Sequence, residues 1–472
     1  MMDVYDEVLV KIVDYVLNPP EFSITAKQNA CWSFLDALGC GILALNFPAC
    51  TKLLGPVVSG AFCEAGSRVP GCDWELDPVQ AAFNIGTMVR WLDYNDTWLA
   101  AEWAHPSDNL GAILAVTDFV YRRQQPHMTL EAVIDAMIMA YEIQGVLAIN
   151  HAFNRQGLDH VILVKLASAL VAAKLLGGDR DMLLRCASQV FVDGQSLRTY
   201  RHAPNTGSRK SWAAGDATAR GVRLALISQT SEMGYPSAIS ESRWGFSAVS
   251  FANQSIDLIR PLNCYVMENI LWKIAYPAEF HAQTAVECAL RLHEDIRHRL
   301  DDIASIQIRT QEPAVRIICK KGPLKNPADR DHCLEYMVAV ALGLGRLEAT
   351  DYEDHVAQKP IIEKLRQLMV VKEDPQFTKD YYDLSQRAIP NAIQIEYKDG
   401  SKSEWVEEYF PIGHPKRRME GIPMLKQKFL NNLHSYYNEA DVSHIKEVFI
   451  DSKDWLKLSL DDFFRLFHPK KK

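Results

Sequence analysis

The chain has 472 residues, of which 48% are hydrophobic and 23% charged, as in an ordinary soluble globular protein. This length is enough for two or three domains, or for one large domain with an insertion. A net charge of −8 argues against general nucleic-acid binding, which usually requires a basic surface.

Ten cysteines are spread over the chain without a C-x-x-C pair, which argues against zinc ribbons and thioredoxin-like sites. The first twenty residues carry acids where a signal peptide needs positive charge. The most apolar stretch, 161–178, is interrupted by Lys165 and Lys174 and is too short to span a membrane. We therefore expect a cytoplasmic protein with free thiols and no membrane association.

Up to about residue 270 the sequence predicts helices joined by short loops. The segment from Ser23 has apolar residues at helical spacing, with Ser23 as the N-cap. Asp77-Pro78 predicts a second start, and Thr129 followed by an acid a third. The stretch 161–178 is apolar nearly all round, which is typical of a buried central helix.

The pattern then changes. Apolar residues alternate around Ile306, and the segment 391–410 reads as two strands about a Lys398-Asp399-Gly400 turn. Helical segments lie between them, one of them running through "HVAQKPIIEKLRQLMVV", and helix returns after residue 412. The expected fold is mainly α, with an all-helical domain and a smaller α+β domain.

The stretch "DYNDTWLAAEWAHPSDN", residues 93–109, is the first candidate for chemistry. It mixes acids and a histidine with two tryptophans, as a pocket wall does when a few polar groups act inside an apolar lining. Asp93 and Thr97 are four residues apart and would share a helical face if the preceding helix continued. A surface loop anchored by two aromatic residues is the alternative.

Three further segments carry candidate groups. His160 follows Asp159 at the start of a helix, where the acid can serve only as a cap. Lys273 and His281 flank Pro277, where a histidine before a helix is often only a cap. The third segment is basic and leads into a helix, as polyanion sites do, although a solvated basic loop would look alike. Its basic residues are Arg198, Arg201, His202, Arg209 and Lys210.

Long blocks of this sequence resemble the MmgE/PrpD family over nearly the whole chain. They include "DPVQAAFNIGTMVRWLDYNDTWLAAEWAHPSDN", "FNRQGLDHVILVK", "DGQSLRTYRHAPNTGSRKSWAAGDA", "GPLKNPADRDHC" and "FPIGHPKRR". The resemblance implies a helical domain built from both chain ends, residues 1–269 and 413–472, and an inserted α+β lid, residues 270–412. It also implies that two copies pair through the helical domain.

The resemblance places the active site between the two domains. Carried over position by position, the implied site residues are Asp93, Thr97, His105, His160, Lys210, Lys273 and His281. Arg201 and Arg209 lie near Lys210 in the sequence and are expected to bind substrate as well. The spacing from Lys273 to His281 is longer than in a related cis-aconitate decarboxylase, and "AVRIICKKGPL" has no clear counterpart of that enzyme's lid tyrosine.

The activity that the resemblance implies is dehydration of 2-methylcitrate to 2-methyl-cis-aconitate in propionate degradation, the methylcitrate cycle. Dehydration of citrate and hydration of cis-aconitate would accompany it. Lys210 and Lys273 would stabilise the aci-carboxylate. His105, oriented by Asp93, would be the leading acid/base group and His160 the second, with their individual steps left open.

An iron–sulfur cluster, the other solution to this chemistry, normally needs a C-x-x-C pair, which this sequence lacks. We therefore expect no cofactor and no metal, and a small tricarboxylate as the ligand. Two alternatives stay open: a cis-aconitate decarboxylase-like enzyme of the same fold, and a non-enzymatic helical interaction protein.

Overall fold

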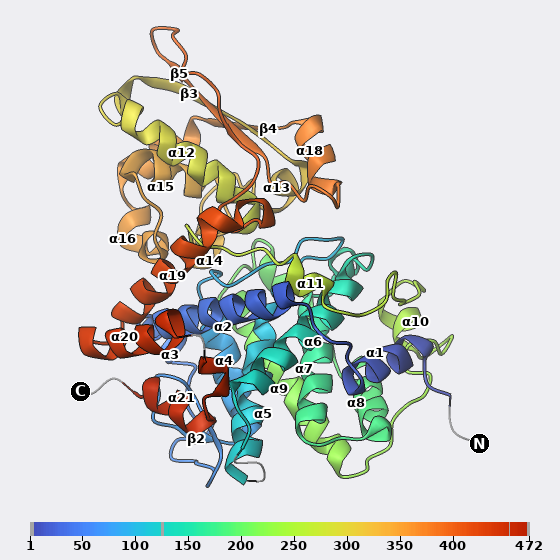
Figure 1. Ribbon diagram of the computed structural model, residues 1–472. Helices are drawn as coiled ribbons and strands as arrows, with labels where there is room; N and C mark the ends of the chain where they lie inside the picture. Colours follow the sequence, from blue (N-terminus) through green and yellow to red (C-terminus); the bar gives the residue numbers. More distant parts are fainter. Residues whose placement is uncertain (1–3, 124–126, 453, 470–472) are drawn as a thin grey trace.

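The structure is a computed structural model that describes residues 4–123, 127–452 and 454–469. A large helical part lies below a smaller part that carries a sheet (Figure 1). The prediction of a mainly α fold is confirmed. No helix among the described residues has the length and apolar character needed to cross a membrane.

Eight longer helices form most of the large part. They are α1 (Glu7–Leu17), α2 (Ile24–Ala44), α4 (Pro78–Arg90), α5 (Leu110–Arg123), α6 (Leu130–Ala148), α7 (Val161–Leu175), α8 (Arg180–Val192) and α9 (Arg209–Gln229). Shorter elements complete it: α3 (Pro48–Thr51), α10 (Phe246–Ser250), α11 (Tyr265–Glu268) and the antiparallel pair β1 (Ser67–Arg68) and β2 (Glu75–Leu76).

Local sequence signals explain several of these helix starts. The Ser23 hydroxyl accepts a hydrogen bond from the Ala26 backbone N–H, and the Asp77 carboxylate accepts two from the first turn of α4. Helix α7 is buried along most of its length, as predicted. The Thr129 side chain, by contrast, makes no capping hydrogen bond, although α6 begins directly after it.

The smaller part contains a four-stranded sheet in the order β4-β3-β5-β6. The strands are β3 (Ile303–Thr310), β4 (Met369–Glu373), β5 (Asn391–Tyr397) and β6 (Val406–Glu408). Strand β3 is parallel to β4 and antiparallel to β5. The expectation of a helix through residues 369–371 was wrong, because Met369–Val371 pair with Ile306–Ile308 on the edge of the sheet.

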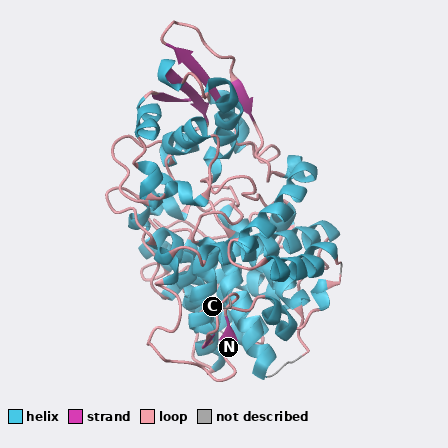
Figure 2. Cartoon of the chain, turned by 90° about the vertical axis from the view of Figure 1, so that its left-hand side faces the viewer, coloured by secondary structure: helices cyan, strands magenta, loops and turns pink. Residues whose placement is uncertain are grey.

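Helices cover this sheet and lead away from it (Figure 2). They are α12 (Gln283–Ile296), α13 (Glu312–Ile317), α14 (Pro327–Arg330), α15 (Leu334–Leu344), α16 (Asp354–Ala357), α17 (Pro360–Gln367) and α18 (Pro375–Tyr382). The chain then returns to the large part through α19 (Arg418–His434), α20 (Glu439–Lys446) and α21 (Leu460–Leu466).

Short helical turns connect these elements. They are η1 (Pro106–Asn109), η2 (Phe153–Gln156), η3 (Arg198–Arg201), η4 (Phe280–Ala282), η5 (Leu300–Asp302), η6 (Ala349–Tyr352), η7 (Pro415–Arg417), η8 (Glu447–Asp451) and η9 (Trp455–Lys457). Three of them, η1, η3 and η4, lie in candidate site segments.

Both ends of the chain contribute to one hydrophobic core. Phe34 of α2 stacks on Trp455 with ring centroids 5.8 Å apart, and Lys428 of α19 lies 2.6 Å from the buried Asp36 carboxylate. This core draws on residues 8–274 and 412–467, whereas a second core draws on residues 278–397. The division at residues 270 and 412 stays a prediction that these cores support, and residues 270–412 are called the lid below.

Candidate active site

Three segments distant in the sequence run side by side where the two parts meet. The Thr97 and Leu271 backbones exchange hydrogen bonds of 2.8 and 3.1 Å, and Trp272 N–H donates to the Gly413 carbonyl at 3.1 Å. A Cβ atom on residue 413 would lie 1.7 Å from the Trp272 carbonyl oxygen, so only glycine fits there. This close approach fixes Lys273, the next residue, beside the stretch 93–109.

Asp93 is the anionic centre of the site. Its carboxylate accepts hydrogen bonds from Arg90 and from Lys273 Nζ, the latter at 2.5 Å. Burial alone would raise the pKa of this carboxyl, but the charges of Arg90 and Lys273 hold it well below its ordinary value. Asp93 therefore stays ionised.

Asp93 and Thr97 do not share a helical face, because the helix that precedes them does not continue to residue 97. Helix α4 ends at Arg90, and the Asp93 backbone has φ +50°, in the left-handed region. The stretch from Asp93 to His105 is an irregular loop, and Thr97 reaches the site through its bridge to Leu271.

His105 lies against this loop with one ring nitrogen engaged. Its Nδ1 is 2.7 Å from the Asp96 carbonyl oxygen, which can only accept, so Nδ1 carries the proton and Nε2 has a free lone pair. The Thr97 hydroxyl is 3.1 Å from the same nitrogen. Burial, reinforced by the charges of Arg90 and Lys273, holds the pKa of His105 well below its ordinary value.

We expected Asp93 to orient the His105 ring, but the two side chains make no hydrogen bond with each other. Asp93 Oδ1 is 4.0 Å from His105 Nε2, beyond hydrogen-bond distance, and is occupied by Arg90 and Lys273. The carbonyl of Asp96 orients the ring instead.

His160 is the second imidazole of the site, with its ring centroid 5.7 Å from that of His105. Its Nδ1 lies 3.3 Å from Asp159 Oδ1, and its Nε2 is buried without a hydrogen-bond partner among the described residues. Arg201 binds the Asp159 carboxylate through two nitrogens, so Arg201 reaches His160 only through that acid. Burial lowers the pKa of His160, and the neighbouring Asp159 carboxylate opposes that shift.

Lys210 connects the helical part to the lid. Its ammonium donates to the Asp331 carboxylate and lies 2.9 Å from His332 Nδ1. His332 Nδ1 in turn is 3.7 Å from Asp93 Oδ2. Burial lowers the pKa of Lys210, with Asp331 acting against the shift.

His281 forms a separate buried unit in the lid. Glu279 accepts from its Nδ1 at 2.8 Å, and the Tyr381 hydroxyl is 3.0 Å from its Nε2. The pKa of Glu279 is lowered: its burial acts in the other direction, but the charges of His281, His332 and Lys273 outweigh it. His281 thus lies near the cluster, but its second nitrogen is occupied by Tyr381.

The structure does not bring Arg209 into this cluster. Its guanidinium lies 3.4 Å from Asp216 and stacks over Trp212 at 4.2 Å, with 38% of the side chain exposed. The helical start at residues 209–210 turns Lys210 inward and Arg209 outward.

Sequence reasoning missed several residues of the site. They are Arg90, Glu279, Asp331, His332 and Tyr381. Asp331 and His332 stand in "GPLKNPADRDHC", a block quoted for the resemblance but given no chemical role. A charged pair directly before the apolar segment of α15 was the available signal.

Most side chains of the cluster are buried, although those of His332 and Asp331 stay 17% and 12% exposed. A cavity of about 270 Å³ adjoins it, lined by Lys210 and Asp331 among others. Within residues 4–123, 127–452 and 454–469, no three histidine, cysteine or acidic side chains converge as metal ligands would. All ten cysteines are free thiols, as predicted.

Comparison with known proteins gives two family matches. Residues 10–259 match the MmgE/PrpD N-terminal domain, and residues 276–453 match the MmgE/PrpD C-terminal domain.

Three relatives are named 2-methylcitrate dehydratase. The Salmonella typhimurium protein is 54% identical over 470 residues, covering 98% of this chain and 97% of its own. The Cupriavidus necator protein is 57% identical over 435 residues, covering 91% and 90%. A mitochondrial one from Yarrowia lipolytica is 50% identical over 473 residues, covering 98% and 91%.

Proposed function

The chain belongs to the MmgE/PrpD family, and we propose that it is a hydro-lyase, a 2-methylcitrate dehydratase that converts 2-methylcitrate to 2-methyl-cis-aconitate and water. Bacterial and fungal relatives of that name align over nearly its full length. Citrate dehydration and cis-aconitate hydration, the same chemistry without the methyl group, accompany this activity.

One observation carries the proposal: two buried imidazoles, His105 and His160, lie with ring centroids 5.7 Å apart beside the buried ion pair of Asp93 and Lys273. Burial and the charges of Arg90 and Lys273 favour the neutral His105 ring, and the Asp93 carboxylate, 4.0 Å from its Nε2, opposes them. The Asp159 carboxylate, 3.3 Å from His160 Nδ1, favours the protonated His160 ring, whereas burial and the charges of Arg201 and Arg198 favour the neutral one. The pKa values of both rings are lowered, but the carboxylate beside His160 is closer than the one beside His105, so we assign the acid to His160 and the base to His105.

His105 Nε2 therefore serves as the base. It takes a proton from the carbon next to a substrate carboxylate, and the electron pair moves into that carboxylate as the aci form. This C–H bond is a very weak acid, so the developing charge needs fixed cations. Lys273 and Lys210 are buried and supply that charge without solvent reorganisation.

His160 serves as the acid for the departing hydroxyl. The three substrate carboxylates bring negative charge to both rings, which raises their pKa and lets His160 carry a proton. That proton goes to the hydroxyl oxygen, the C–O bond breaks and the double bond forms. One water leaves, His105 returns its proton to solvent, and His160 takes up a proton from solvent, which restores both rings.

The remaining roles follow from their contacts. Asp93 holds Lys273, Thr97 holds the His105 segment, and Arg201 keeps Asp159 ionised beside His160. His281 contributes to the site through its hydrogen bond with the Tyr381 hydroxyl. Arg209 takes part only as a charge at the edge of the site. Since the site cations are lysines and arginines and the sequence has no C-x-x-C pair, the proposed reaction uses no cofactor.

The test is an assay of the purified protein with 2-methylcitrate and with citrate, following the ultraviolet absorbance of the conjugated alkene. We expect absorbance to rise with both substrates and no carbon dioxide release from cis-aconitate. Carbon dioxide release without hydration would assign the chain to decarboxylation. A lack of both activities would favour a non-enzymatic role.

The proposal also covers the ligand, the partners, the cellular compartment and the oligomeric state. The ligand is a small tricarboxylate, with no nucleic acid or membrane as partner, and the enzyme acts in the cytoplasm as a homodimer paired through its helical part. The acidic net charge and the family resemblance support this. Light scattering on the eluting protein would give twice 53.3 kDa for the dimer and 53.3 kDa for a monomer.

A further inference from the structure

A second cavity adjoins the junction of the two parts on another side. It measures about 300 Å³ and takes its walls from the loop that holds Leu99 and Trp103, from Arg155 after α6, and from α13 and α18 of the lid. Arg155 and Arg316 are solvent-exposed, so this cavity reaches the surface. Figure 1 shows α13 and α18 above α11 on the right of the molecule, with α14, which borders the first cavity, further left.

The two cavities differ in charge. Among the described residues that line the second cavity, Arg155, Arg316 and Arg387 are basic and none is acidic. The first cavity is lined by one cation, Lys210, and by the acids Asp331 and Glu353. Arg316 is ion-paired with Glu312 at 2.7 Å, which leaves Arg155 and Arg387 as the cations of the second cavity without an acidic partner in the described part of the chain. A trianion approaching the buried site is therefore attracted more strongly by the second cavity than by the first.

Trp103 brings one further cation, Arg198, to the inner wall of the second cavity. The guanidinium of Arg198 lies 5.3 Å from the Trp103 ring centroid and that of Arg316 lies 5.6 Å from it. Arg155 is the least constrained cation, since its guanidinium has no hydrogen bond or ion pair with any described residue. It is available for a ligand.

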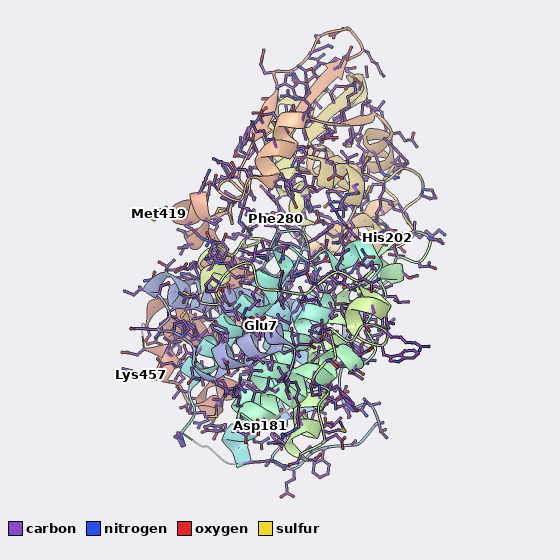
Figure 3. All side chains as sticks on the ribbon, turned by 90° about the vertical axis from the view of Figure 1, so that its right-hand side faces the viewer. Glu7, Asp181, His202, Phe280, Met419 and Lys457 are labelled. Carbon is purple, nitrogen blue, oxygen red and sulfur yellow. The ribbon has the colours of Figure 1, made fainter. Side chains whose placement is uncertain are left out.

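The inner end of the cavity leads to the site. Trp103 packs edge-on against His281 at 6.3 Å, and Tyr381, also on the wall, bonds His281 Nε2. Trp103 and Tyr381 pack against a small apolar cluster that includes Leu99, Leu271 and Phe280, and Leu271 lies two residues before Lys273 in the chain. Figure 3 labels Phe280 at the level where the two parts meet.

From this arrangement we propose that the arginine-lined cavity is the access route of the tricarboxylate substrate, which it receives before Trp103 and Tyr381 admit it to the buried site. This inference rests on the proposed function. Arg155 and Arg387 attract the trianion, and the apolar floor prevents a tight complex there. The cavity of Lys210 and Asp331 is not the route.

The first test measures substrate capture. Arg155→Gln and Arg155→Glu should lower kcat/KM in graded steps, up to about tenfold at low salt, and leave kcat unchanged, as expected when electrostatic steering is lost. The effect should fade as ionic strength rises. Arg465→Gln and Arg465→Glu are matched controls, because Arg465 is 76% exposed on α21, far from the cavity. Equal effects of the Arg155 and Arg465 variants would overturn the proposal.

The second test blocks each cavity. Ala101→Trp fills the mouth of the arginine-lined cavity, and Ala49→Trp fills the wall of the other. Stopped-flow fluorescence with citrate as probe should show slower association only for Ala101→Trp. Slowing by Ala49→Trp alone, or by neither, would contradict the assigned route. Both tests require that the wild-type enzyme converts its substrate. A wild-type chain without activity would therefore reject the proposed function, whereas the results above decide only the access route.

Discussion

Lys210, at the start of α9, donates a hydrogen bond to the carboxylate of Asp331, which belongs to the lid. A second polar contact crosses the same boundary, from His332 of the lid to Asp93 at 3.7 Å. A substrate carboxylate that binds Lys210 must therefore compete with Asp331. If the substrate binds Lys210, its binding is thus coupled to the position of the lid.

Lys210→Met should lower kcat by ~10²-fold or more, because one preorganised charge for the aci-carboxylate is lost. It should also raise KM, because a substrate carboxylate loses its partner. The variant leaves the Asp331 carboxylate without its ammonium partner, so stability falls as well. Lys210→Met/Asp331→Asn is the matched control: thermal melting should recover while kcat stays low. Recovery of kcat in the double variant would show that Lys210 only balances Asp331.

The lid should close around the substrate. Because the site is buried and the ligand is a large trianion, admission requires opening, and closure then excludes water. Amide hydrogen exchange over residues 270–412 should slow when citrate is bound, most clearly around Asp331 and His332. Equal exchange with and without citrate would rule out closure.

Prolonged chelation should leave the activity intact. The proposed mechanism draws its positive charge from Lys273, Lys210 and Arg90, which a chelator does not remove. The measurement compares 2-methylcitrate turnover before and after dialysis against a chelator. Loss of turnover that iron or another divalent ion restores would refute the cofactor-free mechanism.

The parts of the fold set by local interactions could be predicted from the sequence. Ser23 and Asp77 cap helices because their oxygens accept backbone N–H groups within the same turn. Residues 369–371 were predicted as helix because their helical spacing is local, whereas the pairing with β3 that makes them a strand is not.

The sequence predicted which residues form the site better than it predicted the contacts between them. Family resemblance pointed to Asp93 and His105, but the partner of each depends on where α4 ends and how the loop turns. His332 reaches Asp93 from 239 positions away in the chain, across the junction with the lid. Spacing within one segment carries no information about such a contact.

Glu102 gives a pH-dependent stability test. Burial raises its pKa to about 7, so the folded protein holds a proton that the unfolded chain releases near pH 4. The stability that protonated Glu102 contributes is fully present below its pKa in the unfolded chain and is lost as the pH rises through about 7. Glu102→Gln stays neutral at every pH. From pH 5 to pH 8 the free energy of unfolding of the variant should therefore rise by about 3 kcal/mol relative to that of the wild type, as measured by denaturant unfolding. Glu294→Gln, on a side chain 71% exposed, is the matched control. A constant difference across this range would contradict the assignment.

His105→Asn tests the proton transfer itself. Asparagine can still donate to the Asp96 carbonyl, so the loop keeps its shape, but it cannot take a proton from carbon near neutral pH. We expect kcat to fall roughly 10²–10⁴-fold while citrate binding is nearly unchanged. His151→Asn, at a buried histidine bonded to the Leu147 carbonyl outside the cluster, controls for the loss of a buried ring. If His105→Asn retained wild-type turnover, the stretch 93–109 would be structural and His160 would become the base.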